Sequence, residues 1–113
     1  MKSAYGLFLF ILAITAILLA ETKQTATSGA GKQIFVANCA TCHGPDGKGT
    51  STGRAMGIKD LHSPEVLMLT DAQIKTVISN GKGNMPPWKG QLSTVQISEV
   101  AAFVRTLQRT KAK

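Results

Sequence analysis

The stretch Cys39-Ala40-Thr41-Cys42-His43 combines two thiols and an imidazole at a spacing that suits one kind of cofactor. Cysteines three positions apart lie on the same side of a helical turn, so both thiols can reach one edge of a porphyrin. The imidazole of His43 follows directly and can turn beneath the metal as a ligand. The motif therefore predicts a covalently attached haem, with Cys39 and Cys42 as thioethers and His43 as the proximal iron ligand.

Two other chemistries also use a Cys-x-x-Cys pair. A structural zinc site needs four protein ligands, whereas this chain has only these two cysteines and one further histidine, His62. A dithiol redox site is typical of folds in which strands and helices alternate, and that pattern is absent from the sequence. A binding module that uses zinc or a dithiol is therefore the weaker alternative.

An apolar segment precedes the motif by about twenty residues. Residues 6–20 contain no charge and follow Lys2, and Glu21 ends the run. This segment is shorter than the roughly 20 residues that span a bilayer and has the length of a secretory signal core. We therefore predict a signal peptide over residues 1–20 and a periplasmic protein. Later cleavage after Ala30, or an uncleaved anchor at the outer face of the inner membrane, is the alternative.

The remaining chain divides into a leader, one domain and a tail. Residues 21–30 are rich in Thr, Ser, Gly and Gln and predict a flexible leader. Residues 31–109 form the predicted monohaem domain, and residues 110–113 form a basic tail. A domain of this size buries a modest core, so a covalently bound haem would add a large apolar body for side chains to pack against.

The charge balance indicates the kind of partner. The chain has 13 basic and 6 acidic residues, a net charge of +7, and loses only Lys2 with the signal. Nucleic acid is not expected as a partner, because no Lys/Arg cluster is interleaved with aromatic residues. An acidic redox protein fits the charge better. Lys48, Lys82 and Lys89 lie in predicted loops that would flank the haem, where they either dock that partner or form an ordinary solvated surface.

Apolar spacing predicts an all-α domain. Ile34, Phe35, Cys39 and Cys42 recur at three and four residues, which indicates a helix that ends in the haem motif before Gly44. Residues 45–57 and 82–90 are rich in glycine or proline and predict loops. Three further helices are expected: one near 64–68, one over 70–81, and a last one that opens at Ser93 or Ser98 and ends at Arg109.

The identity of the sixth iron ligand decides between electron transfer and chemistry on small molecules. Met85 is the first choice, because glycines before it and prolines after it hold the backbone while the sulfur projects. Thioether sulfur is a soft ligand that favours reduced iron. Met68 is expected to fill the core, Met56 could be a ligand only if its loop folds back, and His62 is expected to be a solvated loop residue.

These motifs, taken in order, resemble the class I bacterial c-type cytochromes, most closely the small c6-like monohaem proteins. The resemblance rests on Gly31 and Phe35 ahead of the haem motif, on residues 80–88 (Asn-Gly-Lys-Gly-Asn-Met-Pro-Pro-Trp), and on the final Val-Ala-Ala-Phe-Val-Arg-Thr-Leu of residues 100–107. It implies three to five helices packed around one covalent haem. It also implies that the first and last helices cross near Gly31, Phe35 and Phe103, and that Met85 is the distal ligand.

The expected pocket and function follow from this resemblance. Phe35, Pro86 and Trp88 are expected in the haem pocket, although Phe35 could equally be an ordinary core residue. The expected function is that of an exported, monomeric single-electron carrier with no turnover chemistry. One alternative is a haem enzyme or gas-binding protein with an open distal site, for which only His62 could serve as polar catalyst. Another is a membrane-anchored subunit of a larger oxidoreductase.

Overall fold

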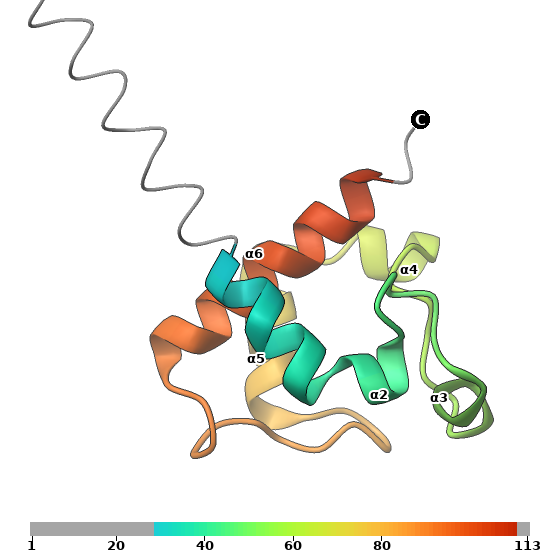
Figure 1. Ribbon diagram of the computed structural model, residues 1–113, viewed down its shortest axis with the longest axis horizontal. Helices are drawn as coiled ribbons and strands as arrows, with labels where there is room; N and C mark the ends of the chain where they lie inside the picture. The colour runs from blue at the N-terminus through green and yellow to red at the C-terminus, as the bar shows by residue number, and fades with distance from the viewer. Residues whose placement is uncertain (1–28, 111–113) are drawn as a thin grey trace, which may run out of the picture.

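The computed structural model describes residues 29–110, so the predicted signal peptide, most of the leader and residues 111–113 lie outside it. The described chain is all-α, as predicted: it has no named strand, and only two isolated bridges pair Lys82 with Met85 and Lys89 with Leu92. None of its helices is long and apolar enough to cross a membrane. The helical segments in chain order are residues 29–38, α2 (Ala40–His43), α3 (Ser51–Ala55), α4 (Pro64–Leu67), α5 (Asp71–Asn80) and α6 (Thr94–Thr110) (Figure 1).

The helix over residues 29–38 crosses α6, and the crossing is confirmed (Figure 1). Gly31 is buried against the backbone of α6, where a Cβ atom would lie 2.7 Å from the carbonyl carbon of Glu99. One turn later the rings of Phe35 and Phe103 meet, with centroids 5.3 Å apart. The absence of a side chain at residue 31 therefore allows the two helices to approach backbone to backbone.

The helix boundaries follow from side-chain caps. Thr70 and Gln73 form a reciprocal capping box at the start of α5, and Gly81 ends that helix with φ 73°. At the start of α6 the Ser93 hydroxyl accepts a hydrogen bond from the Gln96 N–H at 3.1 Å, and the Gln96 side chain accepts one from the Ser93 N–H at 2.9 Å. Ser93 rather than Ser98 therefore opens the last helix.

Three expectations about boundaries were wrong. Residues 29 and 30, assigned to the leader, are already helical, and Thr110, assigned to the tail, is the last residue of α6. The segment 45–57, predicted as loop throughout, contains α3. The prediction from glycine content failed there because the Thr50 side chain caps the helix by accepting the Gly53 N–H, which offsets the low helix propensity of glycine.

The short helix α3 packs against the helix that carries the haem motif. A Cβ atom on Gly53 would lie 2.9 Å from the carbonyl carbon of Cys42. The Thr50 hydroxyl donates to the carbonyl of Thr41 at 2.9 Å, and the Thr50 N–H donates to the carbonyl of Cys42 at 3.0 Å. These contacts satisfy carbonyls at the end of α2, where a helix leaves its last acceptors without internal partners.

We predict that Gly31→Ala destabilises the folded protein by about 1–3 kcal/mol, because the new methyl group forces the crossing helices apart. Thermal unfolding followed by far-UV circular dichroism measures the effect. Gly29→Ala is the matched control, because nothing lies within 4 Å of a Cβ atom at that position. Equal melting temperatures for the two variants would contradict the close-approach role of Gly31.

We predict a loss of similar size for Gly53→Ala, because α3 would have to move away from the end of α2. Thr52→Ala is the control, since Thr52 is an exposed neighbour on the same helix. The same melting experiment compares them. A Gly53→Ala protein as stable as Thr52→Ala would show that the contact between α3 and Cys42 can relax without cost.

Candidate haem site

A mostly apolar cavity of about 420 Å³ lies between the crossed helices, α5 and two loop segments. This volume is in the range of small-molecule and cofactor sites. Five of the eight buried core residues also line it, so the core and the cavity wall are largely the same side chains. Those five are Phe35, Ile74, Ile78, Val100 and Val104.

His43 lines this cavity at the end of α2. Its Nδ1 atom is buried and has no hydrogen-bond partner among the described residues. Burial lowers the pKa of the imidazole, which favours the neutral form that binds metal ions. A buried polar atom without a partner needs an explanation, and a neutral imidazole uncommitted to the protein fits the role of an axial haem ligand.

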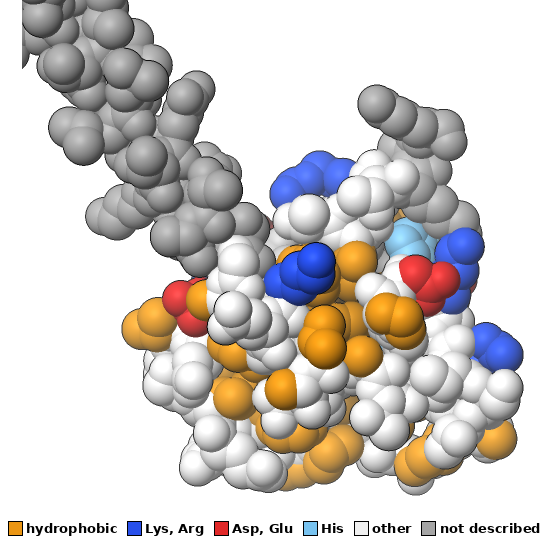
Figure 2. Space-filling view, viewed as in Figure 1, with side chains coloured by type: hydrophobic (Ala, Val, Ile, Leu, Met, Phe, Trp, Pro, Cys, Tyr) orange, Lys and Arg blue, Asp and Glu red, His pale blue; other side chains and the backbone are white. Residues whose placement is uncertain are grey.

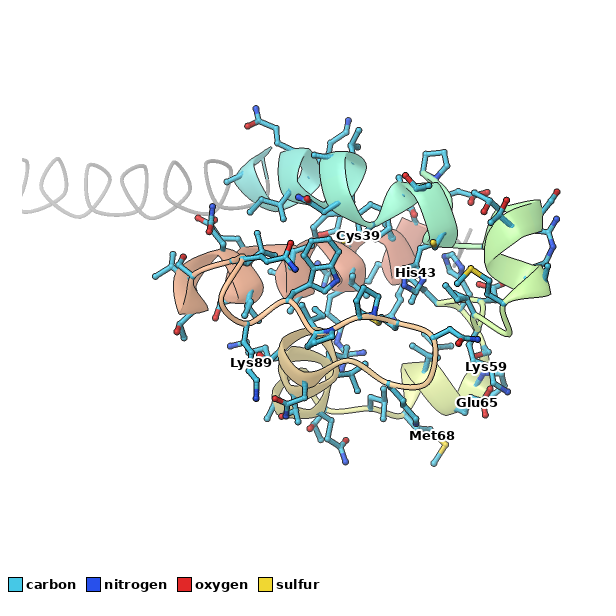
Figure 3. The ribbon with its side chains drawn as sticks, turned by 90° about the horizontal axis from the view of Figure 1, so that it is seen from below. Cys39, His43, Lys59, Glu65, Met68 and Lys89 are labelled. Carbon is cyan, nitrogen blue, oxygen red and sulfur yellow. The ribbon has the colours of Figure 1, made fainter. Side chains whose placement is uncertain are left out.

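The two cysteines are free thiols of intermediate burial, and they differ in position. Cys39 lines the cavity next to His43 (Figure 3), and Cys42 is not part of the lining. Burial, together with the neighbouring Cys42, raises the pKa of Cys39 to about 11. A reactive dithiol needs a lowered thiol pKa, so this environment does not favour the dithiol alternative. Cys39 is thus placed for covalent attachment to a group seated beside His43, and attachment through Cys42 stays a prediction.

Two methionines line the cavity and one does not. Met85 and Met56 are both in the lining, so the loop that carries Met56 does fold back toward the site. Met68 was expected to fill the core, and that expectation was wrong: it is 83% exposed and projects away from His43 (Figure 3). It lies at the end of the single-turn helix α4, which has no buried residue. Met85 and Met56 are therefore the two thioethers within reach of the site.

The segment that presents Met85 is anchored to α5. The N–H groups of Trp88 and Lys89 donate to the carbonyls of Ile78 and Ser79 at 3.0 and 3.1 Å. Gly81 has φ 73°, and a Cβ atom there would lie 2.5 Å from the carbonyl oxygen of Met85. The backbone on both sides of Met85 is thus held against the end of α5, which directs the methionine toward the cavity.

His62 was expected to be a solvated loop residue, and that expectation was wrong. Its side chain is 6% exposed. Nδ1 lies 2.8 Å from the carboxylate of Asp60, and Nε2 lies 3.2 Å from the carbonyl of Leu107 near the end of α6. His62 is not in the cavity lining. It ties the loop after α3 to the last helix, a contact over 45 residues of sequence that no local pattern could indicate.

Two residues expected in the haem pocket, Pro86 and Trp88, are not in the lining of this cavity. Trp88 is partly buried and packs against the hydrophobic core. Lys89 lies on a different side of the molecule from Lys59 and Glu65 (Figure 3). The placement of Pro86 and Trp88 beside a haem therefore stays a prediction.

Part of the cavity wall consists of residues that were not predicted for the site. Lys59 and Glu65 both line the cavity and form an ion pair at 2.9 Å. The same wall includes Val66, Leu69 and Val77. The apolar spacing of residues 70–81 does predict an inward-facing Val77, whereas the ion pair joins a loop to a one-turn helix and has no local signal.

Comparison with known proteins also indicates a c-type cytochrome. Residues 26–104 match the family described as "Cytochrome C oxidase, cbb3-type, subunit III". The chain is 42% identical over 80 residues to the cbb3-type cytochrome c oxidase subunit FixPc of Rhizobium leguminosarum bv. viciae, covering 69% of this chain and 27% of that subunit. It is 33% identical over 104 residues to cytochrome c6 of a Nostoc species, covering 92% of each chain.

A solved structure shares the fold. The KustC0563 c-type cytochrome superimposes with a TM-score of 0.65 at 28% identity, covering 69% of this chain and 96% of that one. The resemblance inferred from residues 31–107 is therefore confirmed. The chain belongs to the family described as cytochrome C oxidase, cbb3-type, subunit III, and is a small class I c-type cytochrome, an electron-transfer haem protein whose cofactor is covalently bound haem c.

Proposed function

We propose that this protein is a single-electron carrier with no turnover chemistry of its own. His43 and Met85 would be the two protein ligands of its haem iron. The observation that carries the proposal is that one apolar cavity is lined by Cys39, by His43 and by Met85, on a segment anchored on both sides. When bound there, haem c supplies an iron that gains and loses one electron. A site closed by two protein ligands changes little between the two oxidation states, which suits transfer.

Each of these residues would have a separate role in binding the haem. Cys39 and Cys42 hold the porphyrin edge as thioethers. His43 provides the proximal nitrogen and Met85 the distal sulfur. Phe35, which is 1% exposed and has its ring centroid 6.4 Å from that of His43, keeps the imidazole in place and excludes water from that side.

The enzyme alternative has less support. His62 is the polar side chain considered for a distal catalyst, and both of its ring nitrogens face other groups outside the cavity lining. Lys59, Lys82 and Asn84, three polar residues of the wall, are exposed. This arrangement favours a carrier over a peroxidase-like enzyme.

The family match supports a second candidate. The chain spans about 27% of the length of the FixPc oxidase subunit, so the same domain could serve as the electron-entry part of an anchored oxidoreductase. The mass of the mature protein, together with its distribution between soluble and membrane fractions, separates the two. A free, exported, monomeric periplasmic carrier has lost residues 1–20 and is soluble.

Charge at the cavity supports an acidic redox partner. Among the three lysines considered for docking, Lys82 lines the cavity, and Lys48 and Lys89 do not. Lys59 also lines it but is paired with Glu65. On the face shown in Figure 2, Lys and Arg side chains are scattered rather than gathered into one cluster. We therefore assign docking mainly to Lys82, with long-range steering by the net positive charge.

We predict that Met85→Ala abolishes the weak red-region sulfur-to-iron band of the oxidised protein and lowers its midpoint potential, because the soft distal ligand is lost. Optical spectra and a redox titration measure both. Met68→Ala is the control, since that side chain is exposed and remote from the site. A band that survives Met85→Ala but disappears in Met56→Leu would transfer the distal role to Met56.

We predict that Lys82→Glu slows oxidation of the reduced protein by ferricyanide, an anionic probe, by about three- to tenfold at low ionic strength. The difference should vanish near 1 M salt, where the screening length is about 3 Å. Lys75→Glu, an exposed charge reversal on α5 outside the cavity lining, is the control. Equal slowing by both variants would mean that net charge alone, and not Lys82, governs the approach.

A further inference from the structure

Met85 lies at one end of a tight backbone turn, which we call the distal turn (residues 82–85). Lys82 and Met85 exchange two backbone hydrogen bonds of 3.1 and 3.0 Å. Gly83 and Asn84 form the tip, with φ 59° at Gly83, a left-handed conformation that glycine adopts readily. The hydrogen bonds to α5 described above hold the chain beyond this turn, at Trp88 and Lys89. Neither of these bonds involves the tip residues Gly83 and Asn84.

The tip is held by the side chain of Asn84. Its Nδ2 atom donates a hydrogen bond of 2.7 Å to the backbone carbonyl of Met56, 28 residues earlier in the chain. A carbonyl can only accept, so the amide must present its nitrogen there. Met56 is the residue that ends α3, and carbonyls at a helix end have no partner within the helix. The bond therefore joins the end of α3 to the tip of the distal turn, and it gives the Met56 carbonyl a hydrogen-bond partner.

This bond crosses the opening of the cavity. On one side the lining contains Met56, Gly57 and Lys59, and on the other it contains Lys82, Gly83 and Asn84. All six residues are exposed as well as cavity-lining, so they surround the place where the cavity meets solvent. We call this set the cavity mouth. The Asn84 bond is the hydrogen bond that connects its two sides.

We propose that Asn84 is a positioning residue that latches the distal turn to the end of α3, and thereby keeps Met85 in place and the cavity mouth closed to small external ligands. The inference rests on the proposed role of Met85 as distal ligand. Asn84 itself needs no contact with the iron. Without the latch, the two bonds between Lys82 and Met85 still form the turn and the bonds to α5 still hold the chain beyond it, but the tip at Gly83 and Asn84 can move away from α3.

Ligand exchange in the haem-loaded, oxidised protein tests this proposal, with imidazole as the probe. Imidazole can bind only after Met85 leaves, and its binding removes the sulfur-to-iron band. We expect Asn84→Ala to raise the observed binding rate about tenfold, which corresponds to about 1.4 kcal/mol. Asn84→Asp has nearly the same size but places a second acceptor against the carbonyl, and should accelerate binding at least as much.

Asn80→Ala is the matched control. It makes the same substitution at an exposed position at the end of α5, outside the cavity lining, so the rate should stay within about twofold of the original. An equal acceleration by Asn80→Ala and Asn84→Ala would show that loss of an asparagine near the distal turn, and not loss of the hydrogen bond to Met56, speeds exchange. That result would overturn the proposal.

Two probes of unfolding separate a latch from a general structural role. On heating, the sulfur-to-iron band of Asn84→Ala should be lost at a lower temperature than in the original protein, while helical circular dichroism should melt as before. Parallel shifts of both signals would make Asn84 a fold residue and overturn the inference. If the unmodified protein lacks the band, the Met85 assignment fails. If the band is present but Asn84→Ala exchanges at the original rate, only the latch fails.

Discussion

Direct contact between backbones, permitted by glycine, positions the segment that carries the haem motif. At Gly31 the helix over residues 29–38, which precedes the motif, meets α6, and at Gly53 α3 meets the carbonyl of Cys42 in α2. In both places a methyl group would overlap backbone atoms, which cannot rotate away as a side chain can. Gly81 plays the same part beneath Met85. The two proposed iron ligands, His43 and Met85, are therefore positioned by close backbone contacts at three glycines.

The sequence indicated those features that depend on local chemistry. The caps at Thr70 and Ser93, the end of α2 at Gly44 and the apolar stripe of α6 all follow from residue type and spacing. The haem motif is a local pattern of the same kind. The family match confirmed haem c, and the solved relative confirmed the all-α fold.

What the sequence could not indicate depends on contacts between distant segments. The burial of His62 requires the carbonyl of Leu107, 45 residues away, and the exposure of Met68 follows from the brevity of α4. The helix α3 was missed because its cap and its packing partner outweigh its low propensity. The proposed mouth latch likewise joins residues 28 positions apart. In each case except Met68, a contact between residues far apart in the sequence decides the structure, and the local sequence pattern does not show it.

The sharing of Phe35, Ile74 and Val100 between the hydrophobic core and the cavity wall has a consequence for the life of the chain in the cell. These side chains also line an apolar cavity that a bound group would fill, so acquiring the cofactor and acquiring a stable fold are linked equilibria. A chain that has not yet received its haem spends more time open and is a better substrate for proteases. Proteolysis would therefore act preferentially on copies without haem.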